Sequence, residues 1–241
     1  MAKADHRNEQ TNNQENISRS PRIKDIKKFD PLTENQRLFF EYYARGDYFI
    51  MLTGSAGTGK TFIACYKALE EVLDKSSPFR KVVIVRSAVQ GREMGFTPGS
   101  AAEKMSLYEQ PYIQIAHTLF GRLDAYELLK EQHKVEFVST SFIRGMSFDD
   151  AIIIVDECQN MTWEELSTVM TRVGYRSKII FCGDYRQSDL YRKSSDKSGL
   201  VTFHEVAKSM ASHTGIEFTT DDIVRSSLVK EFLIAVENLG V

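Results

Sequence analysis

An eight-residue segment of the chain has the residue types and the spacing that bind phosphate groups. It reads Gly-Ser-Ala-Gly-Thr-Gly-Lys-Thr over residues 54–61 and fits the pattern GxxxxGK[ST]. Its glycines allow the backbone to curl so that successive N–H groups face an anion, and a helix beginning at Lys60 adds the positive end of its dipole. We expect the Lys60 ammonium to contact the β- and γ-phosphates of a nucleotide and the Thr61 hydroxyl to bind Mg²⁺. The nucleotide ligands predicted from this phosphate loop (P-loop) are Gly54, Ser55, Ala56, Gly57, Thr58, Gly59, Lys60 and Thr61.

Two adjacent carboxylates follow a wholly apolar segment later in the chain. Residues 152–155 read Ile-Ile-Ile-Val, and Asp156 and Glu157 come directly after them. In P-loop NTPases an aspartate at such a strand end helps to hold Mg²⁺. A neighbouring glutamate can polarise the attacking water. We therefore predict Asp156 as a metal-binding residue and Glu157 as a catalytic residue, because both would lie at the ligand-binding edge of a sheet.

A glutamine follows another predicted strand end. The segment Gly183-Asp-Tyr-Arg-Gln187 comes after the predicted strand over residues 178–182. A side-chain amide at this place can sense the γ-phosphate or orient water. We predict a catalytic role for Gln187, with an ordinary turn as the alternative interpretation.

Apolar segments alternate with helical patterns along the chain, and this alternation predicts the fold. Continuous Val and Ile segments without polar alternation are typical of strands buried on both faces. Strand–helix alternation then indicates a mostly parallel sheet flanked by helices, an α/β fold. The predicted strands are 48–52, 82–85, 135–139, 152–155, 178–182 and 216–218; the predicted helices are 60–74, 101–132 with a break near Pro111, 162–173, 201–210 and 227–239.

Length and composition limit the classes of protein. A chain of 241 residues is long enough for one domain with appendages. With 31 Lys and Arg residues against 33 Asp and Glu residues, the net charge of −2 excludes a protein that coats nucleic acid by bulk charge, but it allows a local basic groove. We expect residues 1–28 to form a disordered polar and basic tail and residues 29–241 to form the domain. Without an apolar segment near the ~18–20 residues that span a bilayer, and without a secretory signal, we expect no membrane contact and a cytoplasmic location.

The order of several short segments resembles that of PhoH-family ATPases. The matching segments are residues 54–61, 95–99, 144–147, 156–160, 171–174, 183–190 and 222–225. The resemblance implies an ATPase with a RecA-like P-loop NTPase domain, the cofactors ATP and Mg²⁺, assembly into a ring such as a hexamer, and RNA or single-stranded nucleic acid as a partner. The chain looks more like a phage-borne member, which would place it in the host cytoplasm. It departs from the family pattern at Ser87, Cys158 and Ser226-Ser227, where the family has Pro, Ala and His-Pro.

Two further site residues come from this resemblance. The segment from Leu32 to Gln36 is similar to the adenine-contacting segment upstream of helicase P-loops, so Gln36 is expected to contact the adenine edge. Helicases of this kind place ATP between two RecA-like domains, and the second domain supplies an arginine. Since this chain has room for one such domain, we predict that Arg225 reaches the ATP of a neighbouring subunit; Arg172 and Arg186 are the alternatives.

Nucleic-acid contacts are predicted at the strand-end loops, where RecA-like motors bind the phosphate backbone. The candidate cations are Arg86, Arg92 and Arg144, and Gln90 lies beside the first two. Tyr108, Tyr112 and Phe96 are candidates for stacking on bases, with core packing as the alternative.

Two other functions remain open from the sequence. A P-loop kinase of a small acceptor would use the same phosphate loop, although Asp156 and Glu157 suit water activation better. A nucleotide-gated binding protein that hydrolyses slowly and acts by assembly is the third interpretation. Release of inorganic phosphate without a second substrate distinguishes the ATPase from the kinase.

Overall fold

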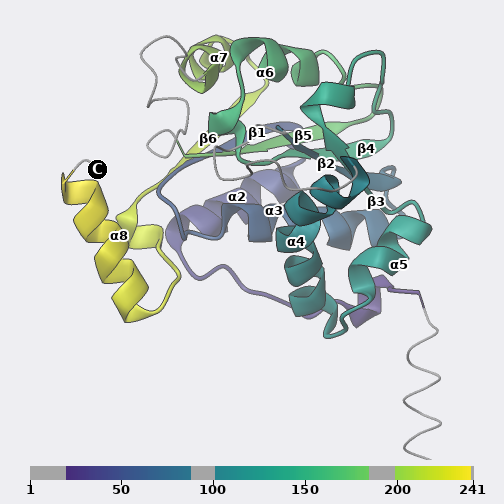
Figure 1. Ribbon diagram of the computed structural model, residues 1–241, viewed down its shortest axis with the longest axis horizontal. Coiled ribbons are helices and arrows are strands. Elements are labelled where there is room, and N and C mark those ends of the chain that lie inside the picture. The colour runs from purple at the N-terminus through teal and green to yellow at the C-terminus, as the bar shows by residue number, and fades with distance from the viewer. Residues whose placement is uncertain (1–19, 88–100, 185–198, 240–241) are drawn as a thin grey trace, which may run out of the picture.

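The computed structural model describes residues 20–87, 101–184 and 199–239, and its centre is one six-stranded sheet in which every strand pair is parallel. The strand order is β3-β2-β4-β5-β1-β6 (Figure 1). The inner strands are continuous apolar segments, as burial on both faces requires. The strands are β1 (Phe49–Gly54), β2 (Lys81–Arg86), β3 (Val135–Ser139), β4 (Ala151–Val155), β5 (Lys178–Cys182) and β6 (His213–Phe218).

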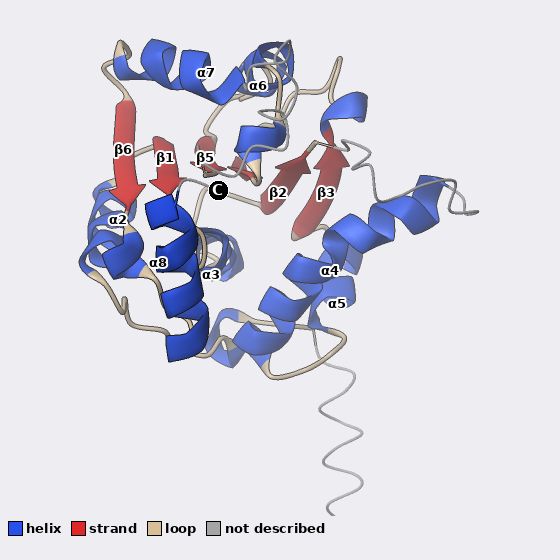
Figure 2. Cartoon of the chain, turned by 60° about the vertical axis from the view of Figure 1, so that its left-hand side comes forward, coloured by secondary structure: helices blue, strands red, loops and turns tan. Residues whose placement is uncertain are grey.

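Helices cover both faces of the sheet, because parallel strands need crossover connections. Figures 1 and 2 show α2, α3, α4 and α5 on one face and α6 and α7 on the other, with α8 beside the β1–β6 side. The helices are α2 (Glu34–Arg45), α3 (Lys60–Leu73), α4 (Ala101–Phe120), α5 (Ala125–Glu131), α6 (Trp163–Met170), α7 (Gly199–Lys208) and α8 (Ser227–Leu239).

The sheet separates two hydrophobic cores, and alternate residues of each strand enter different cores. Ile152 and Ile154 of β4 pack on the side of α2–α5, whereas Ile153 and Val155 pack on the side of α6 and α7. All four side chains are fully buried. The predicted α/β architecture of a mostly parallel sheet flanked by helices is therefore confirmed.

Two boundaries differ from the predictions made from sequence. The predicted break near Pro111 is wrong, because α4 continues through Pro111 and ends at Phe120, just before Gly121 with φ 68°. Proline removes only one helical N–H, and the helix keeps a buried face of Tyr112, Ala116 and Leu119.

The N-terminal boundary also differs. The predicted tail over residues 1–28 includes the described residues 20–28, which form a short 3-10 helix at Ile23–Asp25. The Ile26 side chain packs against the core, and the Lys27 N–H donates to the Leu119 carbonyl at 2.8 Å. Disorder is therefore wrong for residues 20–28, since these contacts hold them against α4. Residues 1–19 lie outside the described residues.

In the portion of the chain that the structure describes, no helix is both long enough and apolar enough to cross a lipid bilayer.

The packing of α7 generates a stability prediction. The Phe203 ring is 5% exposed, lies 4.8 Å from the Phe181 ring centroid and contacts Phe49 on the sheet. Phe203→Ala should lower the free energy of unfolding by about 3–5 kcal/mol, because it removes a ring from the core and leaves a cavity. Leu123→Ala in the segment between α4 and α5 is the control: that side chain is 78% exposed, and its loss should change stability by less than about 0.5 kcal/mol. Urea denaturation measures both, and equal losses would contradict this account of the core.

Candidate nucleotide-binding site

The P-loop joins the C-terminal end of β1 to the N-terminal end of α3, as predicted. Gly54, Gly57 and Gly59 have φ values of 109°, 74° and 81°, the left-handed region that glycine adopts without strain. A Cβ at position 54 would lie 1.9 Å from the Phe218 carbonyl oxygen. That carbonyl accepts the Ser55 N–H at 2.9 Å, so the loop needs glycine where it passes closest to β6.

The C-terminal segment of the chain holds the outer side of the P-loop. The Val224 N–H donates to the Gly57 carbonyl at 3.0 Å, and the Ser55 hydroxyl donates to the Glu237 carboxylate of α8 at 2.9 Å. Glu237 was not predicted from the sequence, because no local pattern links a residue of the last helix to the loop. The P-loop is thus held in its curled form from two sides.

The Lys60 ammonium forms hydrogen bonds with three residues of the P-loop. Its ammonium donates to the carbonyls of Gly54 and Ser55 at 2.9 and 2.7 Å and to the Thr58 hydroxyl at 3.2 Å. Burial lowers the pKa of Lys60, and the Asp184 carboxylate opposes that shift most strongly. The ammonium therefore lies at the mouth of the loop, where a phosphate would meet it.

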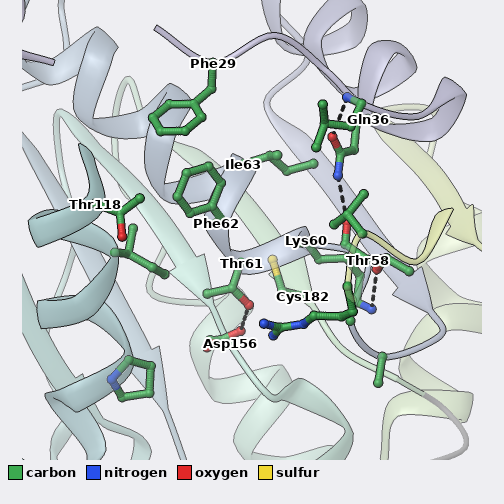
Figure 3. A pocket seen from close by; sticks show the side chains of 18 of the residues that line it. Phe29, Gln36, Thr58, Lys60, Thr61, Phe62, Ile63, Thr118, Asp156 and Cys182 are labelled. Carbon is green, nitrogen blue, oxygen red and sulfur yellow. Dashed lines mark hydrogen bonds between the residues drawn. The ribbon is translucent and has the colours of Figure 1, made fainter. Parts of the chain in front are cut away.

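The two segments predicted to bind Mg²⁺ meet directly. The Thr61 hydroxyl donates to Asp156 Oδ1 at 2.7 Å across 95 residues of sequence (Figure 3). Asp156 is 4% exposed, and its Oδ2 accepts the Tyr112 hydroxyl at 2.8 Å. A hydroxyl and a carboxylate are oxygen ligands that suit Mg²⁺.

Few protein side chains near Thr61 and Asp156 could act as metal ligands. Among the described residues, no three His, Cys, Asp or Glu side chains gather closely enough to hold a metal ion by themselves. Mg²⁺ at phosphate sites usually takes one or two protein ligands and completes its shell with phosphates and water. Thr61 and Asp156 fit that kind of site.

Glu157 lies next to Asp156 in an unusual conformation. Its φ is 52°, and it precedes the 3-10 helix at Cys158–Asn160. Burial raises the pKa of the Glu157 carboxyl, and the adjacent Asp156 carboxylate raises it further. The Gln159 amide donates to Glu157 Oε2 at 2.5 Å, while Gln159 Oε1 accepts the Asp184 N–H at 3.1 Å. Gln159, which was not among the predicted site residues, thus links the Glu157 carboxylate to the end of β5.

These groups open onto one cavity of about 830 Å³. Its polar end holds the P-loop, Asp156, Glu157 and Asp184, and its apolar end holds aromatic side chains that include Phe29, Phe40 and Phe62. Figure 3 shows Phe29 and Phe62 on one side of the cavity, apart from Thr61 and Asp156. A cavity with a phosphate-binding end and an apolar end has the size and chemistry for a nucleotide.

Gln36 lines this cavity and is 3% exposed, so it is not a surface residue of the first helix. Its Oε1 accepts the Leu32 N–H at 2.9 Å, and its Nε2 donates to the Thr58 carbonyl at 2.9 Å. The side chain therefore bridges the segment before α2 and the P-loop. Contact with the adenine edge stays a prediction.

Arg225 lines the cavity of its own chain. A Cβ at Gly57 would lie 3.1 Å from the Arg225 Cγ, so the side chain crosses directly over the loop. Val224 fixes this segment to the P-loop of the same chain. The predicted role of Arg225 at a neighbouring subunit stays a prediction. Arg172 follows α6, is not among the residues that line the cavity, and donates to the Met146 carbonyl at 3.5 Å.

The predicted nucleic-acid residues separate into two groups. Arg86 lines the nucleotide cavity, with its guanidinium 5.5 Å from the Tyr108 ring centroid. Its contact with nucleic acid stays a prediction. Arg144 is exposed and follows the 3-10 helix Thr140–Phe142 at the end of β3. Tyr112 is 2% exposed, so stacking of a base on this ring is wrong and core packing is confirmed.

Several predicted residues lie outside the described residues. They are the catalytic candidate Gln187, the alternative Arg186, and the nucleic-acid candidates Gln90, Arg92 and Phe96.

The structure shows the contacts of two residues that depart from the expected family pattern, Cys158 and Ser87. Cys158 is fully buried against Gly183, which fits the harmless packing predicted for it. Ser87 donates to the Glu165 carboxylate at 2.8 Å, and Thr140 donates to the same oxygen at 2.5 Å. The serine thus joins the end of β2 to α6, a hydrogen bond that proline at this position cannot make.

Known proteins are similar to this chain over most of its length. Residues 28–237 match the family model described as PhoH-like protein. A PhoH-like protein of Bacillus subtilis is 35% identical over 204 residues, which cover 84% of this chain and 62% of that protein. Protein PhoH of Escherichia coli K12 is 35% identical over 188 residues, 77% of this chain and 52% of that protein. The chain thus spans between half and two thirds of the length of these relatives.

A solved structure supports the fold. The large terminase from a thermophilic bacteriophage aligns with a TM-score of 0.51 at 13% identity, over 84% of this chain and 50% of that chain. At this identity the likeness concerns the fold alone, and it confirms the predicted RecA-like P-loop architecture. The family match over most of the chain, with relatives about one third identical, shows that the chain belongs to the PhoH family.

Proposed function

We propose that this chain binds ATP with Mg²⁺ and hydrolyses it to ADP and inorganic phosphate. The observation that carries the proposal is the 2.7 Å hydrogen bond between Thr61 and Asp156. It brings the phosphate-binding loop and the acidic strand end together in one cavity, with Glu157 beside them. Neither segment alone would make an NTPase.

The side chains support a direct hydrolysis. The oxygen of a water molecule bonds to the γ-phosphorus, the bond from that phosphorus to the β–γ bridging oxygen breaks, and the Glu157 carboxylate accepts the proton of the water. The raised pKa of Glu157 makes it a better base than an exposed glutamate. Lys60 and Arg225 would stabilise the negative charge on the phosphates. When bound at Thr61 and Asp156, Mg²⁺ would neutralise part of that charge.

We also propose that ATP hydrolysis is coupled to binding of RNA or another single-stranded nucleic acid. The end of β3 supports it, because Phe142 is 66% exposed and the exposed Arg144 follows two residues later. An exposed aromatic ring and an exposed cation in one segment suit stacked bases and their phosphates. Phosphate release with and without a single-stranded RNA, at low and high salt, tests this part.

Assembly into a ring also stays a proposal. An arginine that acts on the nucleotide of its own chain would not itself require a subunit interface, but the exposed apolar side of α8 supports one independently. Leu228, Phe232 and Leu239 of that helix are each more than 60% exposed. Native mass measurement of the purified chain tests the assembly.

Two substitutions test the chemistry. Lys60→Ala should lower the rate of phosphate release by roughly 10²–10³-fold, because it removes a cation from the phosphates. Glu157→Gln should lower it by roughly 10²–10⁴-fold while ATP still binds, because only the base is lost. The measurement is phosphate release from ATP without a second substrate, with ATP binding followed separately. A wild-type chain that transfers phosphate only to an added small acceptor would support a kinase instead.

The position of Arg225 can be tested by mixing subunits. Arg225→Ala should lower phosphate release by up to roughly 10³-fold, since it removes an arginine from the phosphates. If Arg225 acts on the nucleotide of its own chain, mixing Arg225→Ala chains with Lys60→Ala chains restores no activity. In a trans arrangement, a Lys60→Ala subunit would lend its arginine to the intact P-loop of its neighbour. Recovered phosphate release in the mixture would therefore contradict the cis role.

The raised pKa of Glu157 predicts a pH-dependent stability. The folded chain keeps this proton to a higher pH than the unfolded chain, whose glutamate has its ordinary pKa near 4.5. Ionisation of Glu157 therefore costs stability as the pH rises through the folded pKa, and the cost is absent below pH 4.5. Glu157→Gln should raise the urea midpoint at pH 7.5, and this gain should shrink toward zero as the pH falls to 4.5. Glu231→Gln on the exposed face of α8 is the charge-matched control, and an equal gain there would contradict the assignment.

A further inference from the structure

A tyrosine outside the predicted site contacts its most buried carboxylate. Tyr112 of α4 is 2% exposed, and its hydroxyl donates to Asp156 Oδ2 at 2.8 Å. The residue does not line the nucleotide cavity. It approaches Asp156 from behind, across the β-sheet face that α4 covers.

The two oxygens of Asp156 have different partners. Oδ1 accepts the Thr61 hydroxyl, which lies at the cavity, and Oδ2 accepts the Tyr112 hydroxyl, which lies in the core. The backbone below the carboxylate is also held, since the Asp156 N–H donates to the Val85 carbonyl at 2.9 Å. The tyrosine therefore fixes the rotation of the carboxylate, so that Oδ1 keeps facing Thr61.

The tyrosine itself has little freedom to move. Its ring packs 5.8 Å from the Phe137 ring centroid, and Ala116 and Leu119 of the same helix face are buried beside it. A donor locked by packing can orient its acceptor, whereas a mobile donor only satisfies it.

We propose that Tyr112 is a positioning residue for magnesium binding, which sets the orientation of Asp156 from the core side of the site. This inference rests on the proposed function, because it concerns how the same site binds Mg²⁺ with a nucleotide. Mg²⁺ demands near-ideal octahedral geometry, so a carboxylate free to rotate would bind it less well. Loss of an outer partner of a metal ligand typically costs 10–100-fold in metal affinity.

The chain offers a matched control for the test. Tyr126 of α5 is also 2% exposed, and its hydroxyl donates to the Glu109 carboxylate at 2.7 Å. That carboxylate also accepts Lys130 at 2.8 Å and lies away from the cavity. Tyr112→Phe and Tyr126→Phe each remove one hydroxyl that donates to a carboxylate and keep the buried ring, so both should fold.

The experiment measures Mg²⁺ dependence by binding. Fluorescent mant-ADP is bound to the full chain in EDTA, and Mg²⁺ is then titrated at fixed nucleotide. Tyr112→Phe should raise the half-saturating Mg²⁺ concentration roughly tenfold and leave binding in EDTA unchanged, whereas Tyr126→Phe should change neither. Adding Tyr112→Phe to Asp156→Asn should produce no further shift, because the effect passes through that carboxylate.

The outcomes separate the two proposals. A Tyr112→Phe chain with the wild-type Mg²⁺ midpoint and only a lower urea midpoint would overturn the positioning role, since the hydroxyl would then serve stability alone. An equal shift in Tyr126→Phe would overturn it as well. A wild-type chain that binds mant-ADP with no Mg²⁺ dependence would instead overturn the proposed function, and the positioning role with it.

Discussion

All strand pairs of the sheet run in parallel, and the nucleotide site depends on this shared direction. Leu52 of β1 pairs with Cys182 of β5, and Val155 of β4 pairs with Phe181 of the same strand. The residues after these strand ends therefore emerge side by side at one edge. The Thr61–Asp156 hydrogen bond is a direct result, since it closes the gap between the loop after β1 and the residue after β4. If β4 ran antiparallel to β1, Asp156 would lie at the opposite edge of the sheet from the P-loop.

Hydrogen bonds to other parts of the chain preorganise the P-loop for nucleotide binding. Ser55 bonds to β6 and to α8, and Gly57 accepts the N–H of Val224. A loop already held in the binding conformation loses less conformational entropy when the ligand orders it. The same contacts bring Arg225 over the loop, so loop shape and arginine position share one cause.

The charges of the site show a compromise between stability and function. Burial and the Asp156 carboxylate raise the pKa of Glu157, while Lys60 has its pKa lowered by burial. Both ionised groups are therefore less stable in the cavity than in water. Groups of this kind are common at catalytic sites, where stability is lost so that a proton can be moved. The Gln159 amide limits the cost, because it gives the Glu157 carboxylate a fixed donor.

The sequence by itself determined the parts of this protein that depend on local chemistry. The P-loop, the Asp156–Glu157 pair and the buried strands were all predictable, because each follows from residue types within a few positions of one another. The tertiary structure alone decided the partners that lie far apart in sequence. Tyr112 and Glu237 carry no local signature, and Pro111 lies within a helix because distant packing outweighs one lost hydrogen bond. The position of Arg225 over the loop of its own chain was decided in the same way. Its segment bonds to the P-loop more than 160 residues earlier, and no local spacing encodes a contact between segments so far apart.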